Sequence, residues 1–170
     1  MEYENRCIKF DLPNGNCIDI LNNVFQSIKD YIQFEQNTPE SAGFLLGYQN
    51  RITNNITISD FTVPHSMDIR SRFFCVIKDA FHFLAIKEKS KNQNYYVGVW
   101  HTHPQAIPEP SSVDWNDWNE ALIKDKSGVD YLFFVILGTS EFRVWVGDPS
   151  NNRIVEILES KTNREIYIER

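Results

Sequence analysis

The sequence predicts a mixed α/β fold, in which a sheet is flanked by helices, as a single domain over residues 1–170. Three segments carry apolar residues at helical spacing, and segments rich in β-branched and aromatic residues alternate with them. The strand-like segments near the end of the chain follow one another through short turns. Of the 170 residues 42% are hydrophobic and 14% aromatic, so the chain can bury a core of its own.

The first half of the chain predicts two helices and two strands. Residues 17–36 predict a helix, because apolar side chains recur there every three or four residues, at Ile20, Leu21, Val24, Phe25, Ile28, Tyr31 and Ile32. Pro39 follows this helix, and residues 41–48 and 55–63 predict strands bounded by turn residues. Residues 76–89 again show helical spacing.

The second half predicts one helix and four strands. The helix is expected over residues 112–126, and the strands over 95–100, 131–137, 142–147 and 153–158. A Gly-Thr-Ser-Glu turn joins the second and third of these strands as a hairpin. The charged tail from Glu159 is compatible with helix, strand or coil.

Charge, hydropathy and cysteine content indicate which classes of partner and which cellular compartment fit the chain. The net charge of −6 weighs against a nucleic-acid partner, which normally requires a basic face. The sequence has no apolar run of membrane-spanning length, and its first residues are acidic and polar, so we expect no membrane association. Three well-separated cysteines, Cys7, Cys17 and Cys75, fit inert thiols in a reducing cytoplasm.

Two histidines follow the strand over 95–100 in the pattern His-x-His. Because side chains two apart on a strand point to the same face, the imidazoles of His101 and His103 can reach one point. Ser111 and Asp114 share a face at the start of the next helix, which can turn a hydroxyl and a carboxylate toward the histidines. Two imidazole nitrogens and one carboxylate oxygen are a zinc ligand set that leaves a position open for water.

Hydrolysis at such a zinc also requires a general base. Zinc lowers the pKa of bound water to about 7, but a carboxylate must take the proton and hand it to the leaving amine. Glu40 is the candidate, since it precedes the 41–48 strand and is followed by the small residues Ala42 and Gly43. Spacing alone does not select Glu40 from the other acids of the chain.

Four features together resemble the JAB/MPN family of JAMM zinc metalloproteases: the run Glu-Ser-Ala-Gly-Phe-Leu-Leu-Gly, the His-x-His-Pro motif, the gap of seven residues between His103 and Ser111, and Ser-x-x-Asp. Every position of the motif holds the residue that the family requires. The resemblance implies a JAB/MPN-like, cytidine-deaminase-like domain with one zinc ion per chain, bound by His101, His103 and Asp114. It also implies that Glu40 is the general acid/base and that Ser111 donates a hydrogen bond to the oxyanion.

The finer pattern, Trp-His-Thr-His-Pro and then Pro-Glu-Pro-Ser-Ser-Val-Asp-Trp, is similar to bacterial JAB proteins of CBASS antiphage operons. The family role there is to undo the ubiquitin-like conjugation of a cGAS-like nucleotidyltransferase, which an E1/E2-type ligase makes. The resemblance therefore implies a protein substrate with an extended C-terminal tail, either a ubiquitin-like conjugate or a conjugated nucleotidyltransferase. Whether the bond is peptide or isopeptide stays open.

Several of these residues also have purely structural interpretations. Ser111 and Asp114 alone would fit a helix capping box, and a His-x-His pair alone is often just two strand residues. His65 and His82 have no partner at metal-binding spacing, so we expect both to be structural.

Other polar and aromatic residues near the motifs are expected to lie outside the chemistry. Trp100 alternates to the face opposite the histidine and predicts a core position, and Trp115 and Trp118 predict packing on the last helix. Glu109 lies between two prolines and is not counted as a ligand. The two arginines of the loop over 64–72 either contact a substrate tail or are solvated, and we favour solvation.

Two other classes of function remain as alternatives. A protein-binding scaffold of the same fold would need no metal, and a DNA-associated JAB-like protein would need a basic stripe that the sequence lacks. A nucleobase deaminase requires a Cys-x-x-Cys pair, which is absent. A cysteine or serine nucleophile would need a nearby histidine that is not committed to metal.

Overall fold

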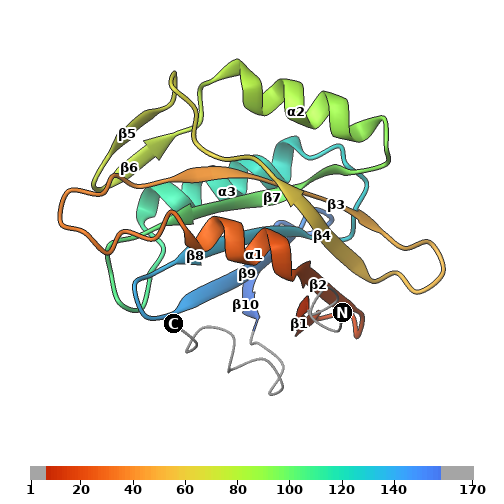
Figure 1. The fold of residues 1–170 in the computed structure, drawn as a ribbon. Helices are drawn as coiled ribbons and strands as arrows, with labels where there is room; N and C mark the ends of the chain where they lie inside the picture. The colour runs from red at the N-terminus through yellow and green to blue at the C-terminus, as the bar shows by residue number, and fades with distance from the viewer. Residues whose placement is uncertain (1–6, 158–170) are drawn as a thin grey trace, which may run out of the picture.

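The computed structural model describes residues 7–157 and contains an eight-stranded mixed sheet with helices packed on both faces (Figure 1). The strand order is β1-β2-β4-β3-β7-β8-β9-β10. These strands span Cys7–Asp11 (β1), Cys17–Leu21 (β2), Ala42–Gln49 (β3), Ile56–Phe61 (β4), Tyr95–Thr102 (β7), Leu132–Leu137 (β8), Phe142–Asp148 (β9) and Arg153–Ile157 (β10). A separate hairpin pairs β5 (Ile69–Ser71) with β6 (Phe74–Val76). The predicted fold class is confirmed.

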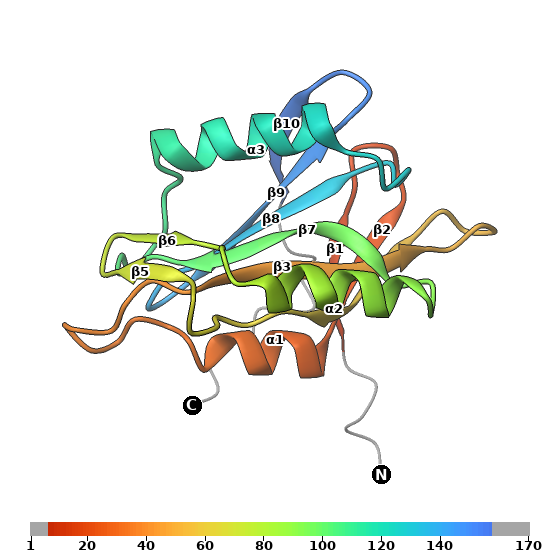
Figure 2. The same cartoon turned by 90° about the horizontal axis from the view of Figure 1, so that it is seen from above.

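Three helices cover the sheet: α1 (Asn22–Lys29), α2 (Ala80–Ser90) and α3 (Ser112–Lys124). Figure 2 shows α1 and α3 on opposite sides of the sheet, and α2 contacts β3 and β7. Strands β2 and β4 are parallel, as are β7 and β8, and the other neighbours are antiparallel. Within residues 7–157 no helix is both long and apolar enough to cross a membrane.

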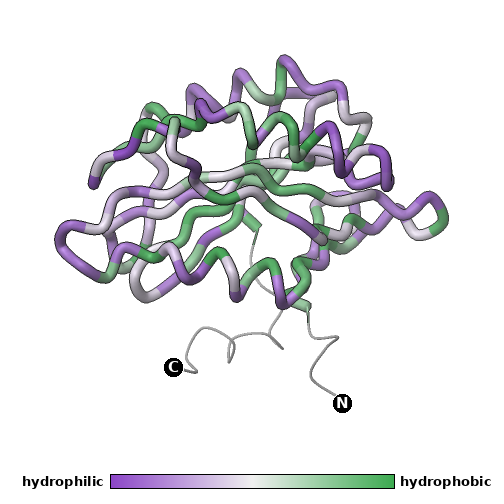
Figure 3. The backbone as a smooth tube through the Cα atoms, turned by 45° about the horizontal axis from the view of Figure 1, so that its top comes forward, coloured by the Kyte–Doolittle hydropathy of each residue, from purple (hydrophilic) through white to green (hydrophobic). Residues whose placement is uncertain are grey.

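The core lies on both faces of the central strands, which carry the hydrophobic stretches in Figure 3. Every residue of β8 is buried, as expected of a strand with helices over both faces. On one face Trp100 is fully buried beside Tyr31, with ring centroids 5.5 Å apart, which confirms its predicted core position. On the other face Trp118 stacks on Phe134 at 4.8 Å.

The predicted helix over residues 17–36 is wrong at both ends. Cys17–Leu21 is a strand, because Ile18 and Ile20 alternate into the core between β1 and β4. Ile20 fits helical and strand periodicity equally well, so the sequence pattern alone does not separate the two. Helix α1 is therefore only Asn22–Lys29. Strand β1 is absent from the sequence-based prediction, which treats its pairing partner β2 as helix.

The helix predicted over residues 76–89 begins later, at Ala80. Asp79 adopts an extended conformation and its carboxylate accepts a hydrogen bond from Phe81 N, so it caps the helix. The preceding residues form β6, which pairs with β5 inside the segment predicted as loop. The other predicted elements agree with the structure to within two residues at each end, and the tail from Glu159 lies outside the described residues.

Candidate metal centre

Four predicted site residues converge at one edge of the sheet. Glu40 lies two residues before β3, and the register pairs Ala42 with His101, so the start of β3 faces the end of β7. His103 follows the last residue of β7, and Asp114 lies in the first turn of α3. Ligand atoms of Glu40, His101 and His103 all lie within 4.8 Å of one another.

The spacing of the imidazole and carboxylate atoms fits a tetrahedral metal. The Nε2 atoms of His101 and His103 are 3.1 Å apart. Asp114 Oδ1 lies 3.1 Å from His101 Nε2, and Asp114 Oδ2 lies 3.5 Å from His103 Nε2. Zinc bonds of about 2.0–2.2 Å place tetrahedral ligands about 3.3–3.6 Å apart. Small shifts of these three side chains would therefore seat a zinc ion.

Glu40 occupies an unusual electrostatic environment for a carboxylate. Only 6% of the surface of Glu40 is exposed to solvent. Burial raises the pKa of Glu40 from 4.5 to about 7, with His101 opposing the rise and the charge of Asp114 adding to it. Within residues 7–157 no hydrogen bond reaches the Glu40 carboxylate. The position of this carboxylate therefore depends on the backbone that carries it.

Ser111 and Asp114 form a capping box at the start of α3. Asp114 N donates to Ser111 Oγ at 3.2 Å, and Ser111 N donates to Asp114 Oδ2 at 2.6 Å. Burial alone would raise the pKa of Asp114, but bonds from His101 and Ser111 outweigh it and hold the pKa well below its usual range. The capping interpretation thus holds, and the same cap places the Asp114 carboxylate beside the histidines.

A contact to Gln105 fixes the ring of His103. His103 Nδ1 donates to Gln105 Oε1 at 3.3 Å, and Glu109 N donates to the same oxygen at 2.8 Å. A proton on Nδ1 leaves Nε2 free to bind a metal. The sequence analysis does not identify Gln105, because a glutamine in a proline-rich loop carries no pattern of its own.

The interpretation of the 64–72 loop as solvated is wrong for both of its arginines. Arg70 Nε donates to the backbone oxygen of Glu40 at 2.8 Å. Arg72 Nη1 donates to the backbone oxygens of Glu35, at 3.0 Å, and Gln36. These partners are more than 29 residues away in sequence, so no local pattern indicates them.

A cavity of about 310 Å³ opens beside Glu40 and His101. Most of its lining is apolar, with Phe44, Val76 and Phe134 among its walls. Cys75 also lines it, and burial raises the pKa of this thiol to about 11, as expected of a cysteine that is not a nucleophile. The cavity therefore places an apolar lining beside the candidate metal centre.

Four of the remaining residues behave largely as their structural interpretations predict. His82 is fully buried, bonded to Thr62 and Asp68, and His65 stacks on Phe81. Trp118 is buried, whereas Trp115, whose ring contacts that of Trp118, is 37% exposed.

Glu109 pairs with Arg143, whose Nη1 donates to Glu109 Oε1 and to the backbone oxygen of Pro108. The loop after His103 is thereby held to β9.

The chain belongs to the family of prokaryotic homologues of the JAB domain, whose model matches residues 31–148. This match contains all five predicted site residues and confirms the resemblance seen in the sequence.

Curated relatives share one name, CD-NTase/cGAS isopeptidase. The Vibrio cholerae protein is 32% identical over 138 residues, which cover 79% of this chain and 83% of the relative. The Escherichia coli protein is 26% identical over 145 residues, covering 84% and 88%. The Pseudomonas aeruginosa protein is 27% identical over 114 residues, covering 65% and 71%.

A solved structure shares the fold. The solution structure of a protein from Desulfitobacterium hafniense aligns with a TM-score of 0.55 at 17% identity, covering 84% of this chain and 89% of that one. At this identity the likeness concerns the fold alone.

Proposed function

We propose that this chain is a zinc-dependent isopeptidase that releases a cGAS-like nucleotidyltransferase from its conjugates in a CBASS antiphage system. The observation that carries the proposal is the convergence of His101, His103 and Asp114, whose ligand atoms lie 3.1–3.5 Å apart, with Glu40 beside them. The name shared by three curated relatives supports the substrate and the isopeptide bond.

His101, His103 and Asp114 would hold the metal through two Nε2 atoms and a carboxylate oxygen. Zinc in such a site supplies a Lewis acid and lowers the pKa of water to about 7. The buried strand end and the Gln105 contact orient the two imidazoles, and the capping box orients the carboxylate. The donor set leaves room for a further ligand, as hydrolytic sites require.

Glu40 acts as the general acid/base. It takes a proton from the attacking water and returns it to the nitrogen of the departing lysine, which then leaves as a neutral amine. A pKa of about 7 suits both steps, because a group with that pKa is a usable base and a usable acid at neutral pH. Low exposure also limits competition from bulk water.

Ser111 is proposed to donate its hydroxyl hydrogen to the oxyanion that develops on the scissile carbonyl. Its oxygen accepts from Asp114 N, and rotation of the hydroxyl would point its hydrogen at substrate. Ser111 is exposed, so an extended C-terminal tail of the conjugated protein can reach it. An E1/E2-type ligase system that makes the conjugate is the expected genetic partner.

Metal content tests the site first. Elemental mass spectrometry should find about one zinc ion per chain in the purified protein and little in His103→Ala. Glu109→Gln, which changes an exposed acid in the same loop, should retain the metal. A folded parent that takes up no zinc after reconstitution would support the metal-free scaffold instead.

Cleavage tests the chemistry. Glu40→Ala should keep its zinc but lose hydrolysis, and conjugates that it retains in its native cell should contain a nucleotidyltransferase. Normal cleavage by this variant would show that Glu40 is not the base. A retained conjugate without a nucleotidyltransferase would contradict the proposed substrate.

A further inference from the structure

Beneath the candidate metal centre, four polar side chains meet from segments that are distant in the sequence. Gln33 follows α1, Ser41 precedes β3, Arg70 lies in β5 and Thr102 ends β7. Gln33 and Ser41 are 1% exposed and Thr102 is fully buried. Buried polar groups of this kind need hydrogen-bond partners, and these residues supply one another with them.

Arg70 holds the backbone on both sides of Glu40. Its Nε donates to Glu40 O at 2.8 Å, and its Nη2 donates to Pro39 O at 3.5 Å and to Ser41 Oγ. Glu40 N in turn donates to Ser71 O at 2.7 Å. The β5–β6 hairpin therefore contacts all three residues of the segment that carries Glu40.

Thr102 ties the same segment to the histidines. Ser41 N donates to Thr102 Oγ1 at 3.0 Å, and Thr102 N donates to Ser41 O at 2.9 Å. Thr102 lies between His101 and His103 in the chain, so its position helps to set the positions of both imidazoles. The segment that carries Glu40 and the strand end that carries the histidines are thus fixed relative to each other.

Gln33 closes the contacts into a ring. Thr102 Oγ1 donates to Gln33 Oε1 at 3.1 Å, and Gln33 Nε2 donates to Arg72 O at 2.9 Å and to Thr38 O at 3.0 Å. Arg72 belongs to the same hairpin as Arg70. The polar ring therefore runs from Arg70 through Ser41, Thr102 and Gln33 and returns to the hairpin.

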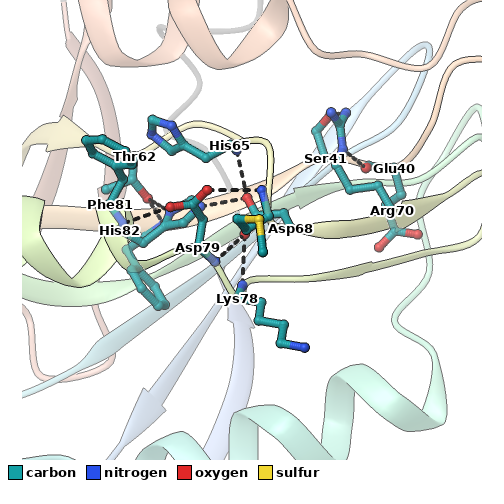
Figure 4. Close-up of polar contacts among 12 residues, drawn as sticks. Glu40, Ser41, Thr62, His65, Asp68, Arg70, Lys78, Asp79, Phe81 and His82 are labelled. Atoms are coloured by element: carbon teal, nitrogen blue, oxygen red, sulfur yellow. Dashed lines mark hydrogen bonds and ion pairs between the residues drawn. The ribbon is translucent and has the colours of Figure 1, made fainter.

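The base of the hairpin is itself anchored, as Figure 4 shows. The Asp68 carboxylate accepts hydrogen bonds from the backbone amides of His65, Lys78 and Asp79 and from His82 Nε2. Thr62 Oγ1 completes the set at 2.7 Å from His82 Nδ1. Burial alone would raise the pKa of Asp68, but these bonds outweigh it and hold the pKa well below its usual range.

We propose that Arg70 and Thr102 are positioning residues for the proposed isopeptidase, acting through the backbone of Glu40. The Glu40 carboxylate accepts no hydrogen bond within residues 7–157, so the polar ring sets where it stands relative to the histidines. A displacement of about 1 Å between reacting groups can cost a factor of about 100 in rate. The ring should therefore govern turnover while leaving the metal ligands intact. This inference rests on the proposed function.

Four variants separate positioning from simple stability. Thr102→Val and Arg70→Gln should lower kcat roughly 10- to 100-fold, while the zinc affinity, measured by chelator competition, stays within about threefold of the parent. Thr102→Ser should keep kcat close to that of the parent, because serine retains the hydroxyl. Arg72→Gln is the matched control, since its guanidinium contacts residues 35 and 36 and its backbone oxygen still accepts from Gln33.

Hydrogen exchange provides a readout that needs no substrate. In Thr102→Val the Ser41 amide loses its acceptor and should exchange at least about tenfold faster by NMR, whereas Thr102→Ser should protect it. The activity arm uses the conjugate retained by Glu40→Ala.

The two proposals fail in different ways. An unchanged kcat in both Thr102→Val and Arg70→Gln would overturn the positioning role, as would a loss of zinc affinity equal to the loss of kcat. A zinc-loaded parent that cleaves no conjugate would overturn the proposed function, while protection of the Ser41 amide would still show whether the ring forms.

Discussion

The candidate metal centre has two halves that are built differently. Glu40 and His101 come from strand ends, are each 6% exposed, and are held by the sheet and the buried polar ring. His103 and Asp114 come from a loop and a helix start, and both residues are half-buried rather than buried. The strand half lies among buried neighbours and the loop half lies nearer to solvent, so single substitutions should damage the strand half more.

The largest effect is expected from Gly43→Ala in the strand half. An added Cβ would lie 1.9 Å from the backbone oxygen of Thr62 and 2.6 Å from Trp100 Nε1, so the backbone that follows β4 would have to move. We expect the free energy of unfolding to fall by about 3 kcal/mol or more in urea denaturation. Gly128→Ala, where no heavy atom lies within 4 Å of the added carbon, should lose only about 1 kcal/mol from its positive φ of 76°. Equal losses would show that this backbone yields easily.

The second effect depends on pH and concerns Glu40 alone. The pKa of Glu40 is raised from 4.5 to about 7 in the folded state, so ionisation of this carboxyl group opposes folding. The penalty is absent below about pH 4.5, grows as the pH rises, and is complete above about pH 7. In zinc-free protein, Glu40→Gln should therefore be more stable than the parent by about 2–3 kcal/mol at pH 8 and by little at pH 4.5. Denaturation curves at both pH values measure this gain, with the exposed Glu141→Gln as control. An equal gain in Glu40→Gln at both pH values would contradict the prediction.

The smallest effect on the free energy of unfolding is expected at Ser111 in the loop half. Ser111→Ala removes the acceptor for Asp114 N and should lower the free energy of unfolding by about 1 kcal/mol, whereas Ser112→Ala should change it little. If Ser111 also donates to the oxyanion, kcat should fall by roughly 100- to 1000-fold at unchanged zinc content. A kcat that falls no further than that of Ser112→Ala would leave Ser111 as a cap only.

The sequence predicts the site better than the framework that holds it. His101 and His103 follow from strand periodicity and Asp114 from helix geometry, since both depend on neighbours in the chain. Glu40 follows only from the family resemblance, because its partners are about 60 residues away. Arg70 escapes prediction for the same reason.

The errors in the fold have a similar origin. The sequence of β2 predicts a helix because Ile20 satisfies both the helical and the strand periodicity, and only pairing with β1 and β4 decides between them. The β5–β6 hairpin is too short and too exposed to show alternation. Local patterns identified the longer elements, whereas contacts between distant segments decided the rest.

The pairing of Ala42 with His101 also has a consequence for biosynthesis. When the ribosome has delivered β3, the chain holds Glu40 but none of the three proposed metal ligands, and β3 lacks its neighbour β7. The centre can assemble only after α3 has emerged, and β7 gains its other neighbour only with β8. A partly synthesised chain therefore holds only part of the candidate metal centre.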